Sequence, residues 1–159
     1  MSDGAARAYI AGLTLLARRE LAEAQLRARL ARRHFRSEDI DAAVTKLRGE
    51  RALDDSRTAV ACARTEVRVR RRGRLRVIRQ IEALGIAHAI AQDAVAEVFA
   101  DVDEDELLEQ VLDRRLRSGT DLTDPTVFRR THRYLLGQGF DASRVTTCLR
   151  ERAKKRNSL

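Results

Sequence analysis

The residues of this chain that are best suited to binding chemistry are arginines concentrated between residues 64 and 79. Eight arginines lie in this segment, where Glu66 is the only acid: Arg64, Arg68, Arg70, Arg71, Arg72, Arg74, Arg76 and Arg79. Guanidinium groups form paired hydrogen bonds with phosphates and carboxylates, and like charges packed this closely repel one another until an anion approaches. The segment therefore predicts a contact with an anionic partner. The alternative is a solvated helix face and loop of which only some members touch anything.

A second basic cluster lies near the C-terminus and contains Arg150, Arg152, Lys154, Lys155 and Arg156. Positive charge at a helix C-terminus is favourable without any ligand, so a binding role and a local role both stay open. We expect Arg150, Arg152, Lys154 and Lys155, together with Arg57, to assist the main segment. The net charge of +8 agrees with an anionic partner, although an arginine-rich surface without a ligand would give the same value.

The basic segments contain almost no aromatic residues, which make up only 4% of the chain. Proteins that bind single strands usually stack bases on aromatic rings. We therefore expect contacts with the phosphate backbone rather than base stacking.

Catalytic constellations are missing from the sequence. His34, His88 and His132 occupy different places in the repeats described below, and no pair of them has the spacing of zinc ligands. No phosphate-binding glycine loop occurs either. Cys62 and Cys148 stand among apolar neighbours and are interpreted as small core residues. The sequence thus predicts a protein that is not an enzyme and that needs no metal and no cofactor.

The elements that must position these arginines are helices. The chain has one proline and eight glycines, and it is rich in Ala, Arg, Leu and Glu, which favour helix. The positions of Phe35, Ile86 and Phe140 mark three copies of one pattern, since they recur at intervals of 51 and 54 residues. Each marker follows an apolar residue by five positions and precedes another by nine: Leu30, Ile81 and Leu135, then Val44, Val95 and Leu149. A period near 50 residues indicates a tandem helical array.

Each copy is predicted to contain a helix, a short turn and another helix, with a further helix in front. Gly85 and Gly139 stand at the turn, where a helix C-terminus needs a left-handed residue, and His34 holds that place in the first copy. The fold class is accordingly all-α, an elongated array of three three-helix repeats. The expected repeats are residues 1–52, 53–100 and 101–159, the last with a basic C-terminal tail. A single globular bundle of the same helices is the alternative.

Several local features predict where helices begin and which faces they bury. Ser37 is expected to cap one helix, Asp54 or Asp55 another, and Asp124 followed by Pro125 a third. A first helix over 8–17 is predicted to turn Leu13 and Leu16 inward. No signal peptide and no membrane-length apolar run is visible, so we expect a soluble, cytoplasmic protein.

The order and spacing of several motifs resemble the RecX family of recombination regulators, over residues 8–152. One motif matches the family's segment that opens the second repeat: Leu53, Asp54, Asp55, Ser56, Arg57, Thr58 and Ala59. A second follows its glycine pattern through the same repeat: Gly73, Arg76, Val77, Ile81, Gly85 and Ile86. Gly139–Phe140 matches the turn of the third repeat, and 15–18 the opening of the first. The chain departs from the pattern at Ala22, where the family often has Ser, at His34, at Thr58, and in the arginines of its second repeat.

The resemblance implies an elongated repeat protein that binds along the RecA–DNA filament. It also implies modulation, mostly inhibition, of the RecA recombinase and ATPase in DNA repair, homologous recombination and the SOS response. We expect a monomer whose arginines contact RecA and DNA phosphates together. The rival prediction is a sequence-tolerant helical DNA-binding protein that acts without RecA, and a protein-only scaffold whose charge is incidental is a third.

Overall fold

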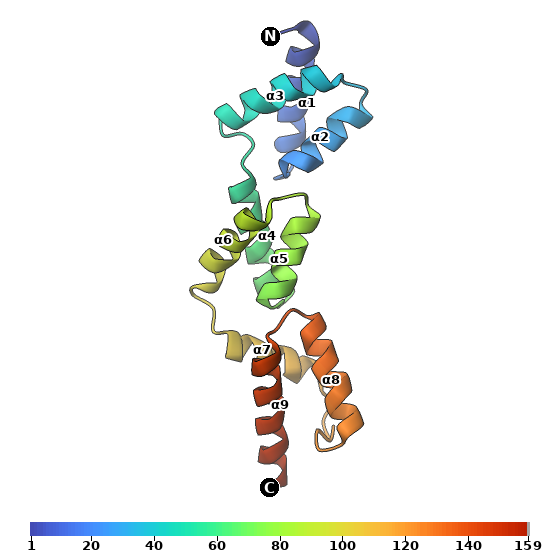
Figure 1. Cartoon of the computed structure of the whole chain (residues 1–159), viewed down its shortest axis with the longest axis vertical. Helices are drawn as coiled ribbons and strands as arrows, with labels where there is room; N and C mark the ends of the chain where they lie inside the picture. Colours follow the sequence, from blue (N-terminus) through green and yellow to red (C-terminus); the bar gives the residue numbers. More distant parts are fainter. Residues whose placement is uncertain (159) are drawn as a thin grey trace. The chain divides into compact units, whose positions relative to one another are not determined.

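A computed structural model describes residues 1–158 of the chain, and within them it contains nine helices and no strand (Figure 1). The predicted all-α repeat fold is confirmed. The helices are α1 (Asp3–Leu16), α2 (Glu23–Arg32), α3 (Ser37–Gly49), α4 (Asp55–Arg68), α5 (Arg74–Ala83), α6 (His88–Phe99), α7 (Glu104–Arg115), α8 (Pro125–Gly137) and α9 (Ala142–Asn157).

The chain forms two compact units. The first consists of residues 1–62 and 80–94, and the second of residues 63–79 and 95–159. Helices α4, α5 and α6, which make up the predicted middle repeat, each contribute residues to both units. The three-part division after residues 52 and 100 stays a prediction about the sequence repeats.

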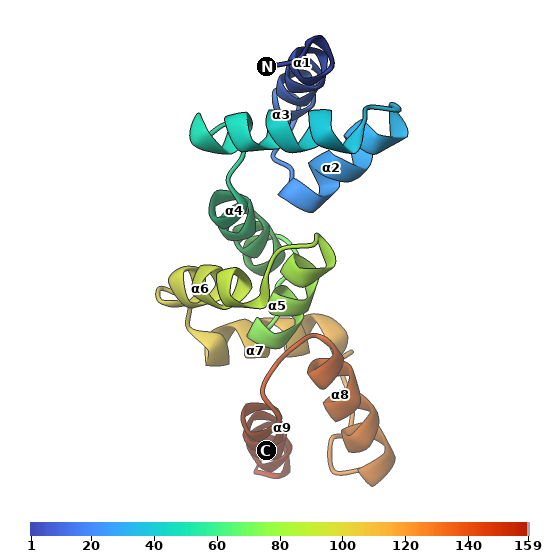
Figure 2. The same ribbon diagram turned by 45° about the horizontal axis from the view of Figure 1, so that its top comes forward.

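The first unit is built around α1, α2 and α3, with α3 crossing α1 and contacting α2 (Figures 1 and 2). Leu26, Leu30 and Leu47 are fully buried at its centre. The face that α1 buries carries small residues, Ala5, Ala8 and Gly12, and ends with Leu15. A Cβ atom at Gly12 would lie 2.8 Å from the Leu47 side chain, so these small residues let α3 approach closely.

The buried face of α1 corrects one prediction. Leu13 is 37% exposed, whereas Leu15 is buried and Leu16 is partly buried against the same core. The helix begins at Asp3, five residues earlier than predicted, and its interior stripe follows the small residues rather than the leucines. A prediction that assigns the buried face from bulky residues alone selects the wrong face of this helix.

The three turn residues adopt the predicted left-handed backbone. The φ angles are 64° at His34, 86° at Gly85 and 98° at Gly139. Both glycines also lie against a neighbouring helix. A Cβ at Gly85 would lie 2.5 Å from the Ala24 Cβ of α2 in the first unit. In the second unit, a Cβ at Gly139 would lie 2.4 Å from the backbone nitrogen of Arg76 at the start of α5. The glycine of each later turn therefore packs on the second helix of the preceding copy.

The second unit contains α7, α8 and α9, and α8 and α9 lie beside each other next to α7 (Figures 1 and 2). Leu108, Leu112, Leu135 and Leu149 are buried between them. The Asp103 side chain caps α7 by accepting from the backbone N–H groups of residues 105 and 106.

Two further cap predictions hold and one is shifted. Asp124 accepts from two backbone N–H groups of the first turn of α8, and Pro125 is the first helical residue, as predicted. The Asp54 carboxylate accepts from the backbone N–H of Arg57, which is the capping role expected for Asp54 or Asp55. Ser37 is the first residue of α3 rather than its cap, a place held by Arg36.

The two cysteines differ from each other. Cys148 is buried as predicted, whereas Cys62 is only half-buried. None of the described helices is both long and apolar enough to cross a membrane.

Candidate functional site

The arginine segment from residue 64 to residue 79 covers the end of α4, the turn after it and the start of α5, all in the second unit. Arg70 pairs with Glu66 at 3.1 Å, and Glu66 is buried. The one acid of the segment is therefore already neutralised by a neighbour one helical turn away.

Two arginines of the turn are held inward. Arg71 has a left-handed φ of 54° and donates from Nη1 to the side-chain amide oxygen of Gln110 on α7. The Nε atom of Arg71 and the Nε and Nη1 atoms of Arg72 are buried and have no hydrogen-bond partner among the described residues. Both side chains are half-buried rather than fully presented to a partner.

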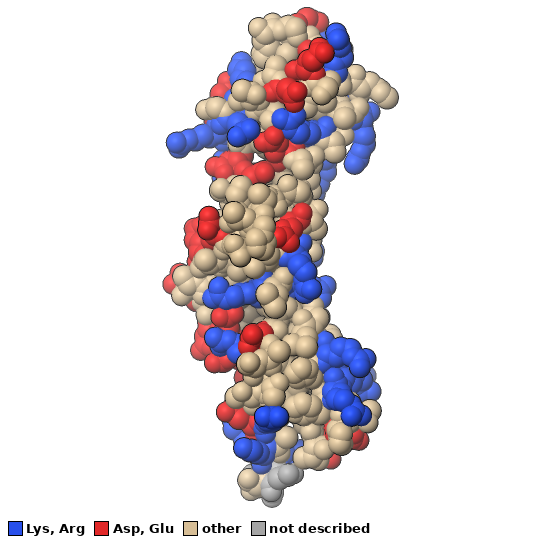
Figure 3. Space-filling model, in the orientation of Figure 1, with Lys and Arg blue, Asp and Glu red and all other residues tan. Residues whose placement is uncertain are grey.

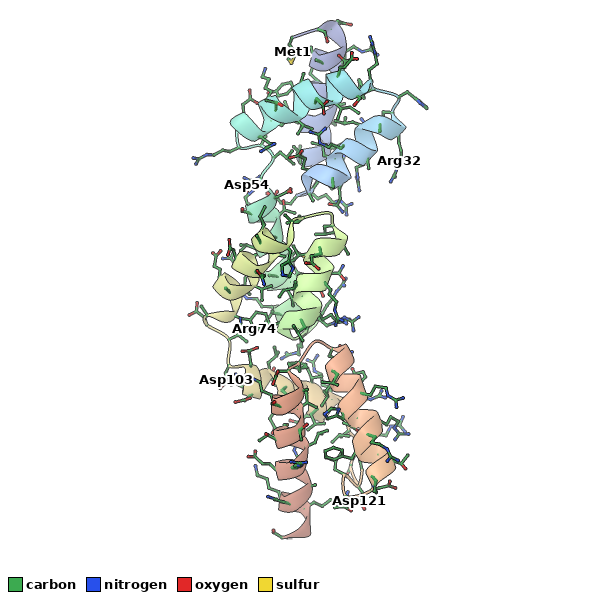
Figure 4. All side chains as sticks on the ribbon, in the orientation of Figure 1. Met1, Arg32, Asp54, Arg74, Asp103 and Asp121 are labelled. Carbon is green, nitrogen blue, oxygen red and sulfur yellow. The ribbon has the colours of Figure 1, made fainter. Side chains whose placement is uncertain are left out.

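Arg74 and Arg76 join α5 to the third repeat. Arg74 Nε lies 3.0 Å from an oxygen of Glu104, the first residue of α7, and its guanidinium lies 4.9 Å from the ring centroid of Phe99. Arg76 Nη1 donates to the carbonyl oxygen of Gly137 at 3.1 Å. Figure 4 labels Arg74 and Asp103, the residue that directly precedes Glu104 in the sequence. These two arginines stabilise the second unit itself. Some of their hydrogen-bond donors are therefore already occupied when a partner binds.

Three arginines of the segment are placed so that they could contact a partner. Arg64 and Arg68 lie one turn apart near the end of α4, Arg79 lies on α5, and all three are exposed. None of them forms an ion pair with another residue between 1 and 158. Of the eight predicted contacts in this segment, these three are the ones whose charge is fully presented to solvent.

The remaining predicted site residues lie elsewhere. Arg57 belongs to the first unit, where it pairs with Glu20 at 2.7 Å, and the hydrogen bond that it donates to Glu20 raises the pKa of its guanidinium. Arg152 on α9 pairs with Glu109 and, at 2.7 Å, with Asp113 of α7. Arg150, Lys154 and Lys155 are exposed on α9.

A further basic surface, not predicted from the sequence, lies on α8. Arg129, Arg130 and Arg133 are exposed there, and the helix contains no acidic residue. Figure 3 shows Lys and Arg side chains gathered over this helix. The available signal was the contrast within α8 between buried Thr131 and Leu135 on one face and arginines on the other. The run of eight arginines at 64–79 is longer than the group of three at 129–133 and was the stronger signal in the sequence.

Fold and surface together define a tandem-repeat, all-α protein with arginine-rich faces. A family model described as "RecX, first three-helix domain" matches residues 8–47. A regulatory protein RecX from Syntrophotalea carbinolica is 31% identical over 134 residues, covering 84% of this chain and 88% of that protein. The chain belongs to the RecX family.

Further comparisons agree with this assignment. A regulatory protein RecX from Geobacillus kaustophilus is 27% identical over 139 residues, and these cover 87% of this chain but about half, 51%, of that relative. The crystal structure of RecX from Lactobacillus salivarius superposes with a TM-score of 0.79 at 20% identity, over 95% of this chain and 97% of that one. That structure supports the fold alone.

Proposed function

We propose that this chain is a regulator that binds the RecA–DNA filament and lowers the ATPase and recombinase activity of RecA. The observation that carries the proposal is the family membership, established over most of the chain by a relative named a regulatory protein. The net charge of +8 on the chain supports an anionic partner such as a DNA filament. Catalysis by the chain itself is not part of the proposal.

The contacts we propose come from a subset of the predicted arginines. Arg64, Arg68 and Arg79 are exposed and form no ion pair within residues 1–158, so they lose no internal partner when an anion binds. Arg150, Lys154 and Lys155 on α9 assist them. Arg74, Arg76 and Arg152 already bind groups of their own unit, so their replacement is expected to act through stability as well as through contact.

A titration of RecA ATPase on single-stranded DNA tests the proposal. We expect the protein to inhibit at amounts below one molecule per RecA, because successive repeats can engage successive RecA subunits and raise the effective concentration of each contact. The variant R64Q/R68Q/R79Q should inhibit less. The variant R7Q/R18Q/R19Q, which removes the same charge from exposed positions of the first unit, should inhibit like the unchanged protein.

Two results would decide against this function. An ATPase rate that the protein does not change at any ratio rejects RecA regulation. If that result comes with tight duplex binding and a steep salt dependence, the sequence-tolerant DNA-binding function takes its place.

A further inference from the structure

A cavity of about 380 Å³ in the second unit is lined by three basic residues, two hydroxyl residues and one leucine: Arg115, Arg117, Arg130, Thr120, Thr131 and Leu116. Three of these six residues are arginines and none is acidic. The cavity therefore has a concentrated positive charge, with no lining carboxylate to balance it.

Three different elements bring the arginines together. Arg115 is the last residue of α7, and its guanidinium lies 4.4 Å from the ring centroid of Tyr134 on α8, which holds it in place. Arg117 lies in the loop after α7, and Arg130 lies on α8. Arg117 and Arg130 are exposed, and neither forms an ion pair with any residue of the described chain.

The acids nearest to the cavity along the chain have other partners. Asp113, two residues before Arg115, pairs with Arg152 of α9 at 2.7 Å. Asp121 accepts hydrogen bonds from the Thr123 side chain at 2.7 Å and from its backbone at 2.9 Å, and these bonds lower the pKa of the carboxyl. Asp124 caps α8. Figure 4 labels Asp121 in the loop that precedes α8. The basic surface continues along α8 through exposed Arg129 and Arg133.

We propose that this cavity binds a phosphate group of a nucleic-acid backbone and that Arg129 and Arg133 extend the contact along the strand. Three guanidinium groups and the Thr131 hydroxyl provide more donors than a single protein carboxylate can accept, whereas the Thr120 hydroxyl already donates to the Arg117 carbonyl at 2.9 Å. Phosphate oxygens take paired bonds from several arginines at once. A free phosphate would need only the cavity, whereas the continuation over α8 suits a polymer with repeated charges. The inference deepens the proposed function by assigning it a DNA contact, but its test needs no RecA.

The test measures binding to a labelled oligothymidine by fluorescence anisotropy at several salt concentrations. The variant R117Q/R130Q removes two contacts, and each contact contributes about 0.7 to the slope of log K against log salt for a single strand. The slope should therefore fall by about 1.4, which corresponds to a loss of affinity of roughly 25-fold at 0.1 M salt. The control R18Q/R19Q changes the net charge equally in an exposed loop of the first unit and should shift neither quantity appreciably. Circular dichroism checks that each variant is folded.

Several outcomes would overturn the inference. Equal affinity and slope for R117Q/R130Q and the control reject the cavity as a backbone site. If inorganic phosphate binds in calorimetry and R117Q/R130Q abolishes that binding without affecting the oligonucleotide, the cavity holds a free anion. If the variant loses binding to poly-glutamate but not to DNA, the partner is an acidic protein. RecA inhibition by R117Q/R130Q with unchanged DNA binding rejects this inference and leaves the proposed function standing.

Discussion

Replacement of Gly73 by alanine tests the contact between the second and third copies. Gly73 directly precedes α5, and its backbone N–H donates to the Gln138 carbonyl at 2.9 Å. A Cβ added at Gly73 would lie 2.4 Å from the carbonyl carbon of Gly139 and 2.6 Å from the nitrogen of Phe140. These are backbone atoms of a turn and cannot rotate aside, so the two segments must move apart.

The expected loss follows from the hydrogen bonds at this contact. Besides the Gly73 bond, the Leu75 N–H donates to the Gly139 carbonyl at 3.2 Å, and Arg76 donates to the Gly137 carbonyl at 3.1 Å. Three bonds at about 1 kcal/mol each give about 3 kcal/mol. Alanine returns about 0.4–1 kcal/mol because it restricts the unfolded chain. We therefore expect G73A to lower the free energy of unfolding by about 2–3 kcal/mol.

Urea unfolding and amide hydrogen exchange measure this effect. With a denaturant slope of about 2 kcal/mol/M, the midpoint for the second unit should fall by about 1–1.5 M. The amide of Leu75 should lose protection. The matched control is G137A, in the same turn region, where an added Cβ meets nothing within 4 Å and where alanine favours helix. An unchanged midpoint for G73A, or an equal loss for G137A, would refute the steric argument.

Two smaller predictions concern a turn and a thiol. H34G should raise the free energy of unfolding, measured by heat or urea, by up to about 1 kcal/mol. Glycine adopts the φ of 64° without the strain of a side chain, and the His34 side chain is exposed, so its loss removes no buried contact. A loss of stability would contradict this. Burial, helped by a hydrogen bond to Glu109, raises the pKa of Cys148 to about 12. In a C62A variant at pH 8, iodoacetamide should therefore alkylate Cys148 on the order of a thousandfold more slowly than it alkylates an unfolded thiol with a pKa of about 8.5. The folded state holds the thiol proton more tightly than the unfolded state, so this group stabilises the fold at neutral pH and the contribution is lost as the pH rises from about 9 towards 12. Alkylation at the rate of the unfolded thiol would show that Cys148 is not protected.

The repeat architecture could be predicted from the sequence because it depends on local signals. Left-handed backbone at Gly85 and Gly139, and the cap at Asp124–Pro125, follow from conformational preferences of single residues. The face that α1 buries could not be predicted in the same way. Its buried face is set by how closely α3 approaches, and that distance depends on Gly12 and on Leu47 from a later helix.

The candidate site was harder to predict than the fold for a related reason. A run of arginines in the sequence does not reveal which of them meet an acid or a carbonyl from a distant segment. Arg74 and Arg76 find such partners in Glu104 and in the Gly137 carbonyl, 30 and 61 residues away, whereas Arg64 does not find one within residues 1–158. The basic face of α8 comes from three arginines within residues 129–133, a much shorter run than the eight arginines at 64–79.

Helix starts at equivalent positions contact each other between successive copies, and this accounts for Arg74 in the arginine run. In the first unit, the backbone N–H of Glu23, the first residue of α2, donates at 2.8 Å to Asp55, the first residue of α4. In the second unit, Arg74, the first residue of α5, pairs with Glu104, the first residue of α7. In the third copy the corresponding helix, α8, starts with a proline, which has no N–H to donate, and is capped by Asp124 just before it. Arg74 is therefore engaged by the contact between copies, and the arginines that serve a partner must be sought where no such contact exists.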